Sequence, residues 1–358
     1  MPTTIDYIAA PSSEPVPSST RVAVSVRNLS KRFRVRRRFV DTLRHPFTQS
    51  YMQALTDVNF DIHEGEFFGF LGANGAGKTT LFKILATLVT PDRGTVIVDG
   101  FDVVDHAADV RRILTPVIAD ERSLRWRLSA RENLRLYAVL YGLPARKVNS
   151  RVDEVLEIVG LDPSDNKLAG RFSSGMRQRL LIARALIPQP RILLLDEPTR
   201  SLDPVSARLL RAFLRDEICK RLGCTVLLAT HTSEEAFELC DRVAILNQGR
   251  PLAIGETDKL QLEFGEDRYA VWTRNVHHPA FDMLTRRGVI SQVVTRGVDD
   301  EGWGRVEMAI PGGAEPAASV LQQLVQQGAA VARFERVELS LGELIQRVIT
   351  RKAGGGSE

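Results

Sequence analysis

The sequence GANGAGKTT, residues 72–80, has the residue types and spacing of a loop that binds phosphate. It matches the pattern G-x-x-x-x-G-K-[ST], follows the apolar run FFGFL and precedes a helix-like segment. Its glycines let backbone N–H groups curl around phosphate oxygens, while Lys78 supplies a positive charge and Thr79 a hydroxyl suited to Mg²⁺. The alternative is a glycine-rich turn without a ligand. We predict nucleotide contacts from Gly72, Ala73, Asn74, Gly75, Ala76, Gly77, Lys78, Thr79 and Thr80.

An acidic pair follows the apolar run ILLL at 192–195. Ligands gather at the carboxyl ends of the strands in open α/β sheets. We predict that Asp196 holds Mg²⁺, directly or through water, and that Glu197 polarises the attacking water as a general base. The alternative is that the two acids end a strand and cap the next helix.

His231 ends another apolar run, TVLLATH at 225–231. A histidine there can donate a hydrogen bond to a γ-phosphate oxygen, so we predict a catalytic group of Glu197, His231 and Lys78. The alternative is a helix-capping or core histidine. The other histidines lack such a context and are interpreted as surface or loop residues: His45, His63, His106, His277 and His278.

A second helix start rich in small polar residues lies in FSSGMRQRLLIARALI, residues 172–187. The first turn of a helix presents free backbone N–H groups and a positive dipole end, and it can bind an anion. The chain therefore carries two candidate phosphate-binding helix starts, far apart in sequence. The alternative is a packed helix with a capped start.

The elements expected around these residues alternate between strands and helices. Short apolar runs favour parallel strands covered on both faces, and the more helical part from about 106 to 188 is interpreted as an insertion into an α/β domain. After residue 256 the pattern changes to that of a small α+β unit. We predict a disordered tail, an α/β domain, an accessory C-terminal α+β domain and a flexible tail, at 1–20, 21–256, 257–352 and 353–358.

The bulk composition of the 358 residues is ordinary for a soluble chain, with 44% hydrophobic and 26% charged residues. The net charge of +4 is too small to argue for nucleic acid. No apolar run approaches the roughly 20 residues that span a bilayer. The N-terminus lacks the basic start and apolar core of a signal peptide. The three cysteines follow no metal or disulfide spacing, which favours a reducing cytosol.

Taken together, the motifs resemble the ATP-binding cassette (ABC) ATPase family over about 22–255. The phosphate loop, a signature at 172–176, the acidic strand end, the sequence SLD at 201–203 and His231 occur in the order of that family. The resemblance implies a P-loop NTPase of the ABC type, with a RecA-like α/β core and a helical subdomain. It also implies that the chain binds and hydrolyses ATP with Mg²⁺.

The family signature, usually Leu-Ser-Gly-Gly-Gln, is here FSSGM at 172–176, with Ser173 and Gly175 retained. The resemblance implies that this helix start contacts the γ-phosphate held by the loop of a second copy, in a head-to-tail homodimer with Asp203 at the seam. Phe33 lies where the family places an aromatic that stacks on adenine, and the alternative is a core phenylalanine.

Three features near the predicted site depart from the family or concern its partners. The place of the family's usual glutamine falls at Asp120, whose carboxylate can also coordinate Mg²⁺. Arg125, Trp126 and Arg127 follow where the family contacts a membrane subunit, with core packing of Trp126 as the alternative. The basic segment 34–53 suits acidic lipid headgroups or a partner's loop, or is a solvated surface.

The motifs and the closing helix resemble most the ATPases of bacterial exporters for drugs, glycans or lipids. That resemblance implies separate polytopic permease subunits, a peripheral place at the cytoplasmic face of the inner membrane, and no nucleic-acid partner. The alternatives are an importer ATPase and a soluble ABC ATPase associated with ribosomes or DNA. Intact Glu197 and His231 argue against a non-hydrolysing regulatory dimer. The residues do not indicate the cargo.

Overall fold

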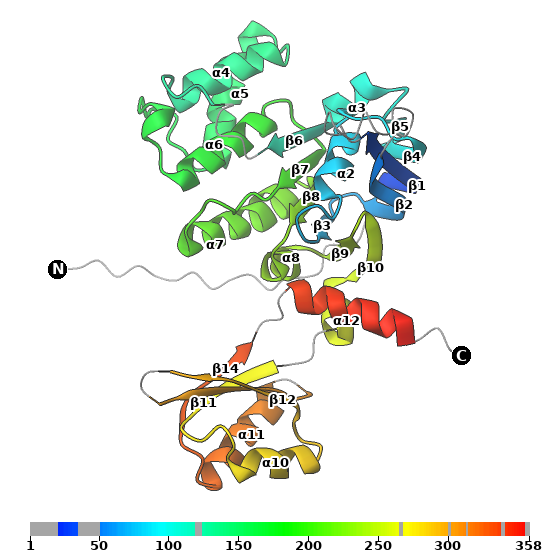
Figure 1. The fold of residues 1–358 in the computed structure, drawn as a ribbon. Helices are drawn as coiled ribbons and strands as arrows, with labels where there is room; N and C mark the ends of the chain where they lie inside the picture. Colours follow the sequence, from blue (N-terminus) through cyan, green and yellow to red (C-terminus); the bar gives the residue numbers. More distant parts are fainter. Residues whose placement is uncertain are drawn as a thin grey trace, which may run out of the picture.

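The computed structural model describes seven stretches of the chain, which form three sheets and the helices around them (Figure 1). The described residues are 21–34, 51–118, 124–264, 268–299, 302–312, 314–337 and 341–354.

A six-stranded sheet forms the centre of the larger part of the molecule, in the order β10-β9-β3-β8-β7-β6. All neighbouring pairs are parallel except β9 with β10. Side chains alternate between two hydrophobic cores, since Phe67 and Leu71 face one core and Phe68 and Phe70 the other. The predicted parallel sheet with both faces covered is confirmed. Its strands are β3 (Phe67–Leu71), β6 (Leu114–Ile118), β7 (Ile192–Asp196), β8 (Thr225–Thr230), β9 (Arg242–Asn247) and β10 (Arg250–Glu256).

The first core lies between this sheet and a largely helical part of the chain. Its helices come mostly from the stretch expected to be an insertion, and each turns an apolar stripe inward. They are α4 (Ala130–Leu140), α5 (Ala145–Ile158), the short η2 (Ala169–Arg171), α6 (Ser174–Leu186), α7 (Pro204–Phe213), the π-helix η3 (Leu214–Arg221) and α8 (Ser233–Leu239).

The second core lies between the same sheet and an antiparallel sheet of order β2-β1-β4-β5. The helix α2 contributes Leu81, Phe82 and Leu85 to it. This layer places the β1–β2 hairpin beside the loop that precedes α2. Its elements are β1 (Val22–Arg34), β2 (Tyr51–His63), α2 (Lys78–Leu85), β4 (Arg93–Val98), β5 (Phe101–Asp102) and α3 (Ala107–Ile113).

The strand β6 lies inside the stretch that the sequence indicated as mainly helical. It is only five residues long and contains Pro116, which has no N–H to donate to a ladder. Proline is tolerated here because, within the described chain, β6 is the edge strand and has β7 as its single neighbour. Brevity and a proline in the middle hide such a strand from pattern analysis.

The chain from β11 to β14 builds a third, antiparallel sheet of order β12-β13-β11-β14, with α10 and α11 on one face (Figure 1). The element order β-α-β-β-α-β is the split-βαβ arrangement. It has its own core, in which Tyr269 stacks on Phe334 with ring centroids 5.2 Å apart. Sequence analysis identified neither α10 nor β12. The elements are β11 (Arg268–Thr273), α10 (Pro279–Arg286), β12 (Ser291–Val298), β13 (Gly304–Ala309), α11 (Ala314–Gln326) and β14 (Val331–Val337).

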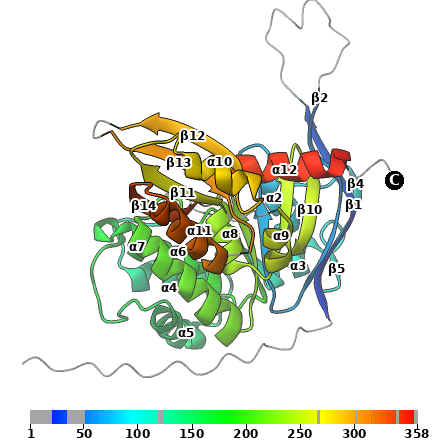
Figure 2. The same ribbon diagram turned by 90° about the horizontal axis from the view of Figure 1, so that it is seen from below.

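Two helices flanking this unit belong to the core of the larger part. They are α9 (Thr257–Phe264) and α12 (Leu341–Gly354), and α12 lies against α9 and β10 (Figures 1 and 2). Leu260, Leu344 and Val348 join the first core. The segment predicted as an accessory domain is therefore anchored to the larger part at both of its ends. Among the described residues, no helix is long and apolar enough to cross a bilayer.

We predict that Leu344→Ala destabilises the protein, because the Leu344 side chain is 1% exposed and packs into the first core. Truncating a buried leucine costs about 2–5 kcal/mol of unfolding free energy. The matched control on the same helix is Ile349→Ala at a position 43% exposed, for which we expect a change within about 0.5 kcal/mol. Thermal or urea unfolding measures both. Equal small shifts would show that α12 does not contribute to the fold.

Candidate functional site

The predicted phosphate loop joins β3 to α2 and has the backbone conformation that its glycines permit. Gly75 and Gly77 have φ values of 83° and 106°, in the left-handed region that favours glycine. The N–H of Gly72 donates to the carbonyl of Thr230 at 3.2 Å, which ties the loop to the end of β8. A Cβ on Gly77 would lie 2.7 Å from the Ala54 carbonyl oxygen, so the β1–β2 hairpin presses closely on the loop.

Lys78 is the first residue of α2 and is 6% exposed. Its Nζ donates to the carbonyl oxygens of Gly72 at 2.5 Å and Ala73 at 3.1 Å. Burial lowers the pKa of the ammonium from its usual range, while the charges of Glu197 and Asp196 oppose that shift. The loop thus holds a partly desolvated cation against its own carbonyls, in a position to exchange them for phosphate oxygens.

Asp196 ends β7 and faces the hydroxyl of Thr79, which donates to its Oδ2 at 3.4 Å. Burial raises the pKa of Asp196, the negative charge of Glu197 raises it further, and the Thr79 hydrogen bond opposes both effects. A hydroxyl and a carboxylate are hard oxygen ligands of the type that Mg²⁺ prefers, so the two side chains fit a magnesium ion completed by water and phosphate oxygens. No group of three or more His, Cys, Asp or Glu residues suited to a metal occurs in the described part of the chain.

Glu197 is held in an unusual backbone conformation directly after Asp196. Its φ is 49°, uncommon for a residue with a side chain, and its N–H donates to the carbonyl of Ala229 at 2.9 Å. Such strain is typical of positions that the surrounding structure over-determines, often at functional sites. It places the Glu197 carboxylate between two cationic or polar side chains, those of His231 and Arg200.

Oε1 of Glu197 lies 3.0 Å from Nδ1 of His231. The histidine nitrogen is assigned as the donor, because an ionised carboxylate can only accept. Oε2 of Glu197 is buried and has no hydrogen-bond partner within the described residues, although Nη1 of Arg200 lies 3.2 Å away as an ion-pair partner. His231 and Arg200 have side chains 46% and 68% exposed, whereas Glu197 is 14% exposed. A buried acceptor without a hydrogen bond is uncommon in native structures, and a functional role is one explanation for it. Arg200 was not among the predicted site residues, and its only signal in the sequence is its place three residues after Glu197.

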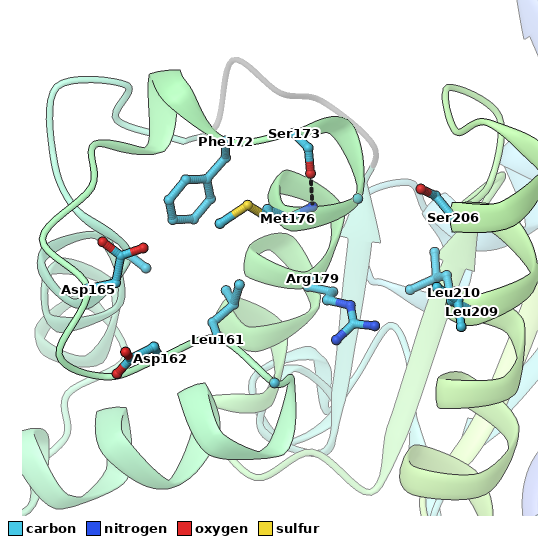
Figure 3. A pocket seen from close by; sticks show the side chains of 13 residues that line it. Leu161, Asp162, Asp165, Phe172, Ser173, Met176, Arg179, Ser206, Leu209 and Leu210 are labelled. Atoms are coloured by element: carbon cyan, nitrogen blue, oxygen red, sulfur yellow. Dashed lines mark hydrogen bonds between the residues drawn. The ribbon is translucent and has the colours of Figure 1, made fainter. Parts of the chain in front are cut away.

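The second predicted anion site, the start of α6, makes no hydrogen bond or ion pair with the phosphate loop in the described structure. Ser173 is the N-cap of α6, and its Oγ accepts the N–H of Met176 at 3.2 Å (Figure 3). A Cβ on Gly175 would meet nothing closer than Ser206 Oγ at 3.7 Å. Both residues line a cavity of about 420 Å³ bordered by α6, α7 and the segment 160–165, with Phe172, Met176, Arg179 and Leu209 among its walls (Figure 3).

Asp203, predicted at a dimer seam, is the N-cap of α7. Its Oδ1 accepts the N–H groups of Val205 at 3.1 Å and Ser206 at 3.0 Å. The pKa of Asp203 is lowered, mainly because Ser206 donates hydrogen bonds to its carboxylate. The carboxylate thus fixes the turn between the acidic strand end and α7.

Phe33 is half-buried near the end of β1 and pairs across the hairpin with Met52. It belongs to none of the three hydrophobic cores of the described chain, and Nζ of Lys31 lies 5.4 Å from its ring centroid. The same hairpin carries Leu55, which presses on Gly77. Phe33 therefore lies on the element that flanks the phosphate loop.

Asp120 falls outside the described residues, as does most of the basic segment 34–53. Trp126 is 49% exposed, which disfavours core packing, and its carbonyl accepts the N–H of Gly170 at 3.0 Å. The backbone N–H of Arg125 donates to Asn133 Oδ1 at 2.8 Å.

The sheet is mainly parallel, and a glycine loop joins β3 to α2. Acidic and imidazole groups lie at the ends of the neighbouring strands. These features together define a P-loop nucleotide-binding protein. The family model described as "ABC transporter" matches residues 55–200. The ABC transporter ATP-binding protein NatA of Bacillus subtilis (strain 168) is 39% identical over 217 residues, 60% of this chain and 87% of NatA. The daunorubicin resistance ATP-binding protein DrrA3 of Streptomyces coeruleorubidus is 41% identical over 224 residues, 62% of this chain and 69% of DrrA3.

Among solved structures, a dimeric post-hydrolysis state of the ATP-binding cassette MJ0796, bound to ADP and Pi, superposes with a TM-score of 0.55. It is 27% identical and covers 65% of this chain and 98% of that one. The chain belongs to the ATP-binding subunits of ABC transporters, a family of ATPases that couple ATP hydrolysis to transport. The predicted family and fold class are confirmed.

We predict that Gly77→Ala weakens ATP binding by at least about tenfold, since 1.4 kcal/mol corresponds to that factor. The new Cβ would lie 2.7 Å from the Ala54 carbonyl oxygen and 2.8 Å from Leu55 Cδ2, at a φ of 106°. Gly65→Ala is the matched control, because Gly65 has φ 72° but open space around its Cβ position. Equilibrium binding of a fluorescent ATP analogue measures both variants. Equal affinities would show that the close contact of hairpin and loop does not shape the binding site.

Proposed function

We propose that this chain binds ATP with Mg²⁺ at the phosphate loop and hydrolyses it with Glu197 as the general base. The observation that carries the proposal is the group formed at one sheet edge. There Thr79 contacts Asp196 at 3.4 Å and His231 contacts Glu197 at 3.0 Å. Lys78 is held by two loop carbonyls beside them.

Each residue has a role that follows from its chemistry. The loop N–H groups and Lys78 bind the phosphates, and Thr79 and Asp196 hold Mg²⁺, which neutralises phosphate charge when bound. Glu197 accepts a proton from the attacking water. His231, whose side chain is 46% exposed, donates to the γ-phosphate in exchange for its contact with Glu197, and the Phe33 ring stacks on adenine. Asp120 is proposed as a further Mg²⁺ ligand on the family pattern alone.

The catalytic site is completed by a second copy of the chain, through Ser173 and Gly175 of the partner. The start of α6 supports this, since a helix start leaves its first N–H groups without backbone partners within the helix. Here Ser173 caps the N–H of Met176 and is itself exposed beside an open cavity. The related MJ0796 cassette is described as a dimer with ADP and Pi. A head-to-tail dimer places the helix start of one copy over the phosphate loop of the other, with Asp203 at the seam.

The work of the dimer is proposed to be export, at the inner face of a membrane and together with separate membrane permease subunits. Relatives include DrrA3, whose name records daunorubicin resistance. Trp126, exposed and followed by Arg127, suits the contact with a permease. The β11–β14 unit is proposed as an accessory domain within the predicted segment 257–352, whose flanking helices α9 and α12 pack with the larger part.

We predict that Glu197→Gln binds ATP, loses at least about 10²-fold in kcat and accumulates as a dimer with ATP. Without the base the nucleotide is retained, so the closed pair cannot reopen. Size-exclusion chromatography with multi-angle scattering, with and without ATP and Mg²⁺, measures the dimer.

The matched variant combines Glu197→Gln with Ser173→Arg, which places a bulky side chain where the partner's phosphate would lie. We expect monomers that still bind ATP with an affinity within about threefold of the single variant. A double variant that dimerises as well as the single one would exclude the two-chain site.

For the partner, we predict that the tagged chain with Glu197→Gln co-purifies with a polytopic membrane protein from detergent-solubilised membranes of its own source. Trp126→Ala, which removes the exposed aromatic, should lower that recovery without changing ATP binding. Mass spectrometry of the eluate identifies the partner. Recovery of ribosomes or DNA in its place would reject the proposed role in export with membrane permease subunits.

A further inference from the structure

Glu235 is a buried carboxylate for which no role was predicted. It is the third residue of α8 and only 2% exposed. Glutamate is almost never fully buried unless its oxygens are paired, because removing a carboxylate from water is costly. Its partners therefore indicate why the residue lies there.

Both carboxylate oxygens of Glu235 accept short hydrogen bonds from threonine hydroxyls. Thr199 Oγ1 donates to Oε1 at 2.7 Å, and Thr230 Oγ1 donates to Oε2 at 2.6 Å. Thr230 Oγ1 accepts in turn the backbone N–H of Thr232 at 3.1 Å. Charge-assisted bonds of this length are stronger than neutral ones.

The two threonines belong to the two segments that carry the proposed catalytic groups. Thr199 lies two residues after Glu197, and Thr230 directly precedes His231. The 3.0 Å contact between Glu197 and His231 completes a closed cycle of contacts between the two segments. Glu235 is the only member of this cycle from α8. A change at Glu235 therefore removes the side-chain link between the two segments, which the backbone bond from the Glu197 N–H to the Ala229 carbonyl also joins.

A simple helix cap is the competing explanation, because Thr232 is the N-cap of α8 and Glu235 occupies the capping-box position. The geometry disfavours it. The Thr232 side chain makes no capping hydrogen bond, and the Glu235 oxygens bond to Thr199 and Thr230 in its place.

We propose that Glu235 is a positioning residue that fixes the distance between Glu197 and His231, acting through Thr199 and Thr230. The inference rests on the proposed function, since it assumes that those two side chains act in hydrolysis. Losing the carboxylate leaves the buried Thr230 hydroxyl and the partly buried Thr199 hydroxyl to find other partners, which loosens both segments. Small misplacements of reacting groups reduce rate more than binding.

The test compares steady-state ATP hydrolysis of the full chain in Glu235→Ala, Thr199→Val and Thr199→Ser. We expect kcat to fall about tenfold or more in the first two, with the KM for ATP within about twofold of wild type. Thr199→Ser keeps the hydroxyl and should retain most of the rate. The control is Glu234→Gln on the same helix, whose side chain is 47% exposed and bonds to Arg211, and its kcat should stay within about twofold.

A second measurement separates positioning from general destabilisation. In a His231→Ala background, Thr199→Val should lower the residual rate no further, because the cycle of contacts has already lost its link from His231 to Glu197. An additive loss there, or equal rates for Thr199→Val and Thr199→Ser, overturns the inference. Thr199→Val decides the matter if Glu235→Ala does not fold. If Glu197→Gln still turns over ATP, the proposed function itself is rejected. If Glu197→Gln loses turnover while Thr199→Val keeps normal turnover, only the role of Glu235 is rejected.

Discussion

The candidate site depends on one constraint, the parallel register of β3, β7 and β8. In that register Leu71 is level with Thr230, and Asp196 with Ala229. The three strands therefore end together, and the chain leaves each of them at the same edge. Two backbone hydrogen bonds continue the pairing past the strand ends, from Gly72 to Thr230 and from Glu197 to Ala229. A loop, two acids and an imidazole far apart in sequence thus meet without any long side chain having to reach across.

The same edge concentrates charges that compensate one another before any ligand binds. Lys78 is partly desolvated, and the negative charges of Asp196 and Glu197 support its protonated form. Asp196 is disfavoured as an anion by burial and by Glu197, yet Thr79 donates to it. Preorganised charges of this kind interact more strongly than in water, because little solvent has to reorganise around them. A bound triphosphate would offer negative charge to Lys78 in place of its internal contacts. Mg²⁺ would likewise offer positive charge to Asp196.

Candidate site residues can be named from the sequence where a motif is local, and the fold can be predicted where a pattern is periodic. The loop at 72–80 and the strand ends at Asp196 and His231 are of this kind, because one continuous stretch defines both the element and its polar end. Glu235 was not found, since its contact with Thr199 joins segments distant in sequence. Arg200 was not found because its position three residues after Glu197 matches no motif. The edge strand β6 was hidden for a different reason: Pro116 is normally incompatible with a strand, and only its place at the edge permits it.

The two sides of the candidate site differ in solvent exposure, and this difference affects how the site can respond to a bound nucleotide. On the buried side, Thr199, Thr230 and Glu235 form a satisfied polar cluster that fixes two segments relative to each other. On the open side, His231 and Arg200 are largely exposed, and their contacts with Glu197 compete with water and ions. Binding a triphosphate can therefore rearrange the exposed pair at small cost while the buried cluster keeps its geometry. A rigid support beneath adaptable groups allows Glu197 to remain in place while its neighbours exchange an internal contact for a phosphate.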